Sequence, residues 1–168
     1  MKSYASPFPK ANRKNIIVTS VTTLYKKRTP ETFARISSAV VNSVGAIRGN
    51  AAVFFPSYEI RDKIHGLAAP SIKKHVILED SRMTKEQRDR VKDDMRLHAA
   101  AGAVLFGVMG GSFSEGIDLP GNLLNGVIVV GLPLERPSLS SRALMDYYQK
   151  RFGKGREYGY TYPALIKV

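Results

Sequence analysis

The residues with the clearest chemical potential lie in one loop, residues 107–121, whose sequence is GVMGGSFSEGIDLPG. Five glycines, two serines and two acidic residues follow an apolar segment there. Glycine lets a backbone approach a ligand closely, and backbone N–H groups without partners bind phosphate well. Serine hydroxyls can donate to phosphate oxygens, and the carboxylates of Glu115 and Asp118 can accept from sugar hydroxyls or metal-bound water. The composition indicates a phosphate-facing loop, with an ordinary turn as the alternative.

Other chemistry is excluded by what the sequence lacks. GxxxxGK[ST] does not occur, so the chain has no complete P-loop, and GxGxxG does not open a helix. Neither Ser112 nor Ser114 lies in a GxSxG motif, which argues against a serine hydrolase. The three histidines, His65, His75 and His98, are far apart and lack HxxxH spacing, so we predict no metal site. The absence of cysteine excludes disulfides and thiolate-bound clusters within this sequence.

Charge is the informative bulk property. Lys and Arg number 26 against 14 Asp and Glu, which leaves a net charge of +12 and a pI of about 10.0. This balance favours a polyanionic partner such as nucleic acid, although a generally basic proteome is an alternative explanation. No apolar run reaches the roughly 18–20 residues that span a membrane. Because residues 1–20 also lack a signal-peptide layout, we expect a cytoplasmic protein with no membrane partner.

The elements that must position the loop alternate along the chain. Strands are predicted at residues 15–21, 51–55, 75–79, 103–108 and 126–132. Helices are predicted at 30–48, 57–65, 84–100 and 138–152, with a loop at 153–160 and a further helix from 161. This order predicts one α/β domain whose parallel sheet is covered by helices on both faces. Ligands bind beyond the carboxyl ends of such strands, where the glycine loop lies.

Two motifs carry a resemblance to a known family. GGSFSEGIDLPG at 110–121, followed by VIVVGLPLERP at 127–137, resembles motif V and its following strand in the XPD/DinG family of superfamily 2 helicases. FFPSYE at 54–59 is similar to motif IV of that family. The SPFP, RTPE and RFGKG segments also resemble it, in the correct order, so the likeness covers nearly the whole chain. The nearest likeness is to archaeal XPD-like proteins.

The resemblance implies a RecA-like second motor domain of an ATP-dependent DNA helicase, which translocates on single-stranded DNA and unwinds duplex and forked DNA. ATP and Mg²⁺ would lie between this domain and the first helicase domain of the same polypeptide. That first domain would carry the P-loop and a four-cysteine 4Fe-4S cluster, which this chain does not ligate. Motif VI, a QxxGRxxR pattern, would follow Val168. We therefore expect residues 1–168 to be a fragment that is inactive alone, with a non-catalytic basic nucleic-acid-binding α/β module as the alternative.

The resemblance also assigns expected roles to individual residues. Nucleotide binding is expected of four loop residues: Ser114, Glu115, Gly116 and Asp118. Asp118 would lie near the ribose or order water and metal around the phosphates, or else only satisfy loop amides. DNA binding is expected of residues in both motifs and after the last strand: Ser57, Tyr58, Arg61, Gly111, Ser112, Phe113 and Arg136. Four of these have structural alternatives, as a helix cap (Ser57), packed aromatic residues (Tyr58, Phe113) or a solvated helix face (Arg61).

Overall fold

Four parallel strands form the sheet of this protein. The computed structural model describes residues 14–114, 119–121, 123–134 and 137–166. The strands are β1 (Ala51–Phe55), β2 (His75–Leu78), β3 (Ala103–Val108) and β4 (Gly126–Val129), in the spatial order β2-β3-β1-β4. Every neighbouring pair is parallel. Because helices connect β1 to β2 and β2 to β3 in a sheet of parallel strands, this is the predicted RecA-like α/β fold.

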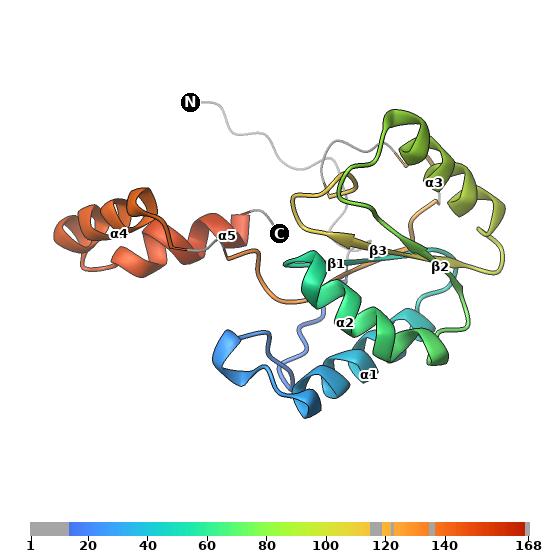
Figure 1. Ribbon diagram of the computed structural model, residues 1–168, viewed down its shortest axis with the longest axis horizontal. Helices are drawn as coiled ribbons and strands as arrows, with labels where there is room; N and C mark the ends of the chain where they lie inside the picture. Colours follow the sequence, from blue (N-terminus) through green and yellow to red (C-terminus); the bar gives the residue numbers. More distant parts are fainter. Residues whose placement is uncertain (1–13, 115–118, 122, 135–136, 167–168) are drawn as a thin grey trace.

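Helices cover both faces of the sheet, as predicted. The helices α1 (Pro30–Ala46) and α2 (Tyr58–Ala68) lie against one face, and α3 (Lys85–Leu97) lies against the other (Figure 1). Each face has its own apolar cluster, and β3 is buried along its whole length between the two. A wholly apolar central strand is expected of a parallel sheet covered on both sides.

Side-chain caps define where the three helices begin. Thr29 accepts the Thr32 N–H at the start of α1, and Pro30 occupies the first helical position. Thr84 and Gln87 form a capping box at the start of α3. Short 3-10 turns at residues 25–27 and 69–71 precede α1 and follow α2. No helix in the part of the chain described above is both long and apolar enough to cross a membrane.

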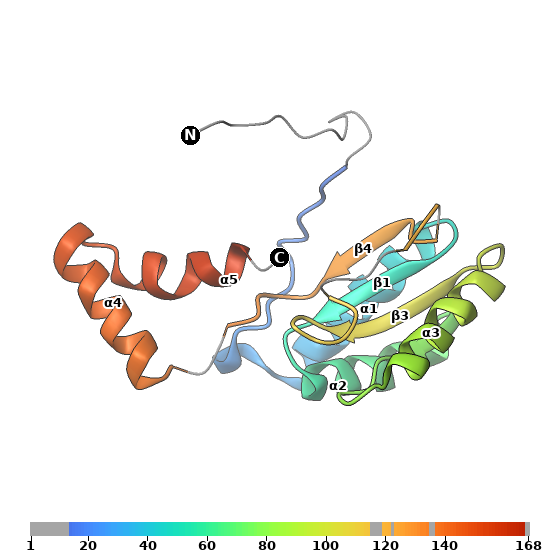
Figure 2. The same ribbon diagram turned by 90° about the horizontal axis from the view of Figure 1, so that it is seen from above.

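The last helices form a separate hairpin beside the sheet (Figure 2). The helix α4 (Leu139–Phe152) ends at Gly153 in the left-handed conformation, and none of its residues is buried. A π-helical turn (Glu157–Thr161) then leads directly into α5 (Tyr162–Ile166). The predicted loop at 153–160 is therefore wrong, because helical structure resumes soon after Gly153. Aromatic rings on Tyr148, Phe152 and Tyr158 pack edge to face or tilted and hold the hairpin together.

The strand predicted at residues 15–21 is also wrong, because the structure pairs these residues with no strand of the described sheet. Ile16 and Ile17 are 73% and 87% exposed, and only Val21 packs against the core. β-branched composition favours extended backbone, but a strand also needs a neighbour to supply hydrogen bonds. No such neighbour pairs with this segment among the described residues, so the local preference alone does not make a strand.

Asn50 connects the elements at the amino ends of the strands. Its side chain is fully buried and donates to the carbonyls of Met95 (2.8 Å) and Leu123 (2.9 Å). Its Oδ1 accepts the N–H of Ala103 at 2.7 Å. One amide thus satisfies three buried backbone groups from α3, β3 and the segment before β4, which fixes the edge of the sheet opposite the glycine loop.

Candidate nucleotide and DNA-binding edge

The segments that resemble motifs IV and V, at 54–59 and 110–121, meet at the carboxyl edge of the sheet because the strands before them are neighbours. Phe55, the last residue of β1, is in register with Val108, the last residue of β3. The turn at Ser57 follows β1, and the glycine loop follows β3. The Met109 N–H donates to the Phe55 carbonyl at 2.9 Å, which extends the pairing into the loop. Two segments about fifty residues apart in sequence therefore lie side by side.

A buried carboxylate, Glu79, organises this edge. It follows β2 directly and is 1% exposed. Its Oε2 accepts the N–H of Val108 at 2.8 Å, and its Oε1 accepts the N–H of Phe113 at 3.3 Å. Both ends of the first loop turn are thus held by one side chain. Hydrogen bonds from backbone N–H groups to a carboxylate are stronger than those to neutral acceptors, so Glu79 gives the loop a defined shape.

The loop itself is a tight turn that uses most of its own amides. Gly110 has φ of +81° and donates its N–H to Ser114 Oγ at 2.8 Å. The Ser114 hydroxyl donates in turn to the Gly111 carbonyl at 3.1 Å. The Gly111 N–H donates to the Val108 carbonyl at 2.8 Å. A Cβ on Gly111 would lie 2.5 Å from Oε1 of Glu79, so the close approach of loop and carboxylate requires glycine there.

The segment that resembles motif IV leads into a capped helix whose first turn faces the same edge. The hydroxyl of Ser57 accepts the Ile60 N–H at 3.4 Å, which makes Ser57 the cap of α2. Tyr58 is half-buried, and the Arg61 guanidinium lies 4.8 Å from the centre of its ring. Burial raises the pKa of the Tyr58 hydroxyl, and the negative charge of Glu79 raises it further. This phenol therefore stays a neutral hydrogen-bond donor through physiological pH.

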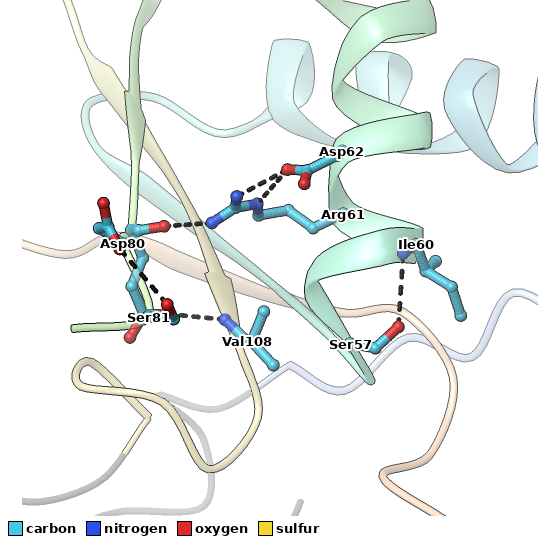
Figure 3. A network of polar contacts seen from close by, with 8 residues as sticks. Ser57, Ile60, Arg61, Asp62, Asp80, Ser81 and Val108 are labelled. Atoms are coloured by element: carbon cyan, nitrogen blue, oxygen red, sulfur yellow. Dashed lines mark hydrogen bonds and ion pairs between the residues drawn. The ribbon is translucent and has the colours of Figure 1, made fainter.

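Arg61 supports the edge from within. It is 8% exposed, and its Nη1 donates to the backbone carbonyl of Glu79. Its Nε and Nη2 both contact Oδ1 of Asp62, at 2.8 and 2.6 Å. Figure 3 shows the Arg61 side chain between Asp62 on its own helix and the chain segment at Asp80. The hydrogen bond from Arg61 to the Glu79 carbonyl therefore connects α2 to the end of β2. Phosphate contact by Arg61 stays a prediction.

The remaining predicted residues divide into those that the structure describes and those that it does not. Gly111, Ser112 and Ser114 are half-buried in the loop, next to the Ser57 turn. Phe113 is 7% exposed and packs in the cluster beneath α3, as its structural alternative expected. Four predicted residues lie outside the described part of the chain: Glu115, Gly116, Asp118 and Arg136.

Glu79 is the residue that the sequence interpretation missed. Its segment, HVILE at 75–79, was assigned as a strand, and the final acid was given no role. The available signal was its place: an acidic residue directly after an apolar strand, at the edge where the glycine loop was expected. Its partners are 29 and 34 residues away in sequence, so the contact itself could not be predicted from local spacing.

Comparison with known proteins identifies the family. A model of the helicase C-terminal domain matches residues 40–168. The chain belongs to this family. It is 29% identical over 153 residues to the ATP-dependent DNA helicase XPD of Sulfolobus acidocaldarius, a match that covers 88% of the chain and 26% of that protein. It is 31% identical over 145 residues to a probable ATP-dependent helicase of Methanocaldococcus jannaschii, covering 79% of the chain and 20% of that protein. Human ATP-dependent DNA helicase DDX11 is 27% identical over 138 residues, covering 74% and 14%.

Solved structures give the same assignment at the level of the fold. An XPD helicase structure superposes with a TM-score of 0.66 at 22% identity, covering 88% of this chain and 26% of that one. A structure of apo XPD superposes with a TM-score of 0.62 at 25% identity, covering 88% and 29%. The chain is therefore a C-terminal domain of the XPD/DinG type of superfamily 2 helicases. It spans about a quarter or less of the length of the curated relatives that it matches.

Proposed function

We propose that this chain is the second motor domain of an XPD-like, ATP-dependent DNA helicase, which translocates on single-stranded DNA and unwinds duplex, including forked DNA. The observation that carries the proposal is that the segments resembling motifs IV and V lie at one edge of a RecA-like sheet, where Glu79 accepts from the glycine loop and from Arg61 of α2. Membership of the helicase C-terminal domain family supports it. Residues 1–168 supply one side of a composite site, and the first helicase domain of the same polypeptide supplies the other.

On the nucleotide side, we propose that Ser114, Glu115, Gly116 and Asp118 face ATP and Mg²⁺ at the interface with the first domain. The amides of Gly110, Gly111 and Phe113 donate within the chain, so they are not free to bind phosphate. The loop therefore fits the role of completing a nucleotide site whose phosphate-binding groups lie on the first domain. When bound, ATP supplies the phosphoryl-transfer chemistry that drives movement. The residues of this chain would orient the nucleotide and exclude water at their side of the interface.

On the DNA side, we propose contacts from Ser57, Tyr58, Ser112 and Arg136, with Gly111 allowing close approach of the strand. The neutral phenol of Tyr58 can donate to a phosphate oxygen, and its ring can stack on a base. Phe113 and Arg61 would act by positioning the loop and α2. The net charge of +12 supports a polyanionic partner. A 4Fe-4S cluster and a P-loop, if present in the whole protein, would belong to the first domain, since this chain has neither cysteine nor a GxxxxGK[ST] pattern.

The test compares ATP hydrolysis and DNA affinity in the full-length protein. Replacing Asp118 by Ala should lower the single-strand-stimulated ATPase rate more than about tenfold, a loss of about 1.4 kcal/mol of transition-state stabilisation. Affinity for single-stranded DNA should stay within about twofold of the unchanged protein. Asp89→Ala, on the exposed face of α3, serves as the charge-matched control. An ATPase rate equal to that of the control would remove Asp118 from the nucleotide site.

A second candidate is a non-catalytic nucleic-acid-binding module, which the strongly basic charge favours. Titrating the 168-residue chain with single-stranded DNA at two salt concentrations addresses it. Each phosphate that the chain neutralises on a single strand should contribute about −0.7 to the slope of log affinity against log salt. Tight, salt-sensitive binding by this chain, together with a whole protein that lacks a P-loop, would favour this candidate over the helicase.

A further inference from the structure

Three side chains of types that commonly bind metals lie close together at the amino ends of the strands, on the edge opposite the candidate nucleotide site. His75 is the first residue of β2, Asp94 lies in the last turn of α3, and His98 is the residue that caps that helix. The Nε2 of His75 is 2.9 Å from Oδ2 of Asp94, and the Nε2 of His98 is 3.5 Å from its Oδ1. One ligand atom from each residue lies within 4.8 Å of the others.

The separation of these atoms suits a small transition-metal ion. Zinc binds imidazole nitrogen and carboxylate oxygen at about 2.0–2.2 Å, so neighbouring ligands of a tetrahedral site are about 3.4 Å apart. The two distances to Asp94, 2.9 and 3.5 Å, are to different oxygens of its carboxylate. The three ligand atoms lie within 4.8 Å of one another, so they must draw closer around a bound ion. Two nitrogens and one oxygen are a typical donor set for Zn²⁺, whereas Mg²⁺ and Ca²⁺ prefer oxygen alone.

The surroundings favour a cation. The imidazole rings of His75 and His98 stack with centroids 4.0 Å apart and planes at 16°, so one ring must turn before both nitrogens can point at a single ion. Asp94 and His98 are spaced i, i+4 on α3, so their side chains lie on the same face of the helix. They also lie at its carboxyl end, where the helix dipole is negative and stabilises positive charge.

Neighbouring basic side chains do not compete for the carboxylate. Lys74 donates its ammonium to the carbonyls of Ile47 and Gly49, both at 2.6 Å. Arg96 is paired with Asp93 at 2.6 Å. Asp94 is therefore left to the two imidazoles. All three side chains are about a third or more exposed, so an ion can reach them from solvent.

We propose that His75, Asp94 and His98 form a binding site for a divalent transition metal of the zinc class, which clamps the end of α3 to the start of β2. Such a site would strengthen the attachment of α3 to the sheet. α3 is the most polar of the helices that cover the sheet, and only Val91 and Met95 are buried from it. A bound ion would add a second attachment beside the bonds from Asn50. Three protein ligands leave a fourth position for water.

The experiment titrates Zn²⁺ and Co²⁺ into the metal-free 168-residue chain, with any affinity tag removed. We expect one equivalent to bind, with Co²⁺ giving the visible absorption of a four-coordinate nitrogen–oxygen site. At a hundredfold excess over Kd, Zn²⁺ should raise the Tm by roughly 5–10 °C, whereas Mg²⁺ should leave it unchanged. Absence of saturable binding at one equivalent would overturn the proposal.

Variants separate a built site from adventitious binding. His75→Ala, His98→Ala and Asp94→Asn should each weaken Zn²⁺ binding at least about tenfold, because each removes one of three ligands. His65→Gln, which changes the remaining histidine on α2, should bind like the unchanged chain and is the matched control. Circular dichroism of the metal-free variants shows whether each is folded. Folded variants of His75 and His98 that bind Zn²⁺ as tightly as the control would refute the site.

Discussion

Replacing Glu79 by Gln tests whether one buried carboxylate shapes the glycine loop. The change keeps the size of the side chain but turns one acceptor oxygen into an NH₂ donor. Because the two oxygens accept from Val108 and Phe113, either orientation of the amide places NH₂ against an N–H. One hydrogen bond to a charged group is lost, worth about 1.5–3 kcal/mol, and the other becomes a weaker neutral bond. We expect the free energy of unfolding to fall by about 2–4 kcal/mol.

Urea denaturation of the 168-residue chain, followed by circular dichroism, measures this loss through the transition midpoint. Asp80→Asn is the control, because it makes the same chemical change at the next position. Asp80 is exposed, and among the described residues it accepts from the Arg82 N–H and the Ser81 hydroxyl, at 3.2 and 3.4 Å. It should change stability by about 0.5 kcal/mol or less. If Glu79→Gln is no more destabilising than Asp80→Asn, the carboxylate does not hold the loop.

Three further predictions concern stability and use the same denaturation assay. Gly111→Ala should cost about 1–3 kcal/mol, because its Cβ would contact Glu79 and the Val108 carbonyl; a neutral effect would show that the loop yields freely. Asn50→Ala should cost about 3 kcal/mol or more by stranding three buried backbone groups, whereas exposed Asn42→Ala on α1 should cost well under 1 kcal/mol. Gly66→Ala, in α2 with no atom within 4 Å of the new Cβ, should instead stabilise by about 0.5–1 kcal/mol, and a loss would contradict the helix geometry.

Much of the fold could be predicted because its signals are local. The caps at Thr29, Ser57 and Thr84 need only residues three positions away, and all three form as the sequence indicates. The buried strands at 51–55 and 103–108 are short apolar runs between turn residues, and their bounds are as predicted. The segment at 15–21 is richer in β-branched residues than either of these strands, but it has no pairing partner among the described residues. Strand formation there depends on tertiary structure that a single segment cannot reveal.

The candidate site was only partly predictable for a related reason. Strand order and parallel pairing place the Ser57 turn beside the glycine loop, and the alternation of elements implies this arrangement. The roles of Glu79 and Arg61 depend on which backbone groups come within hydrogen-bonding distance, which sequence spacing does not determine. His75 and His98 show the same limit. They are 23 residues apart in the sequence, yet the fold stacks their rings, and only the i, i+4 spacing of Asp94 and His98 gave a local signal.

The internal bonds of the glycine loop change what the motif can do. Glycine-rich loops bind phosphate when their amides are free, but Gly110, Gly111 and Phe113 each donate to a group within the chain. Ligand recognition at this half of the loop must then come from side chains, such as those of Ser112 and Ser114, or from residues 115–118. The Ser114 hydroxyl is itself shared between Gly110 and Gly111. A ligand that engaged this hydroxyl would disturb the turn that Glu79 anchors, and the disturbance would reach α2 through the bond from Arg61 to Glu79.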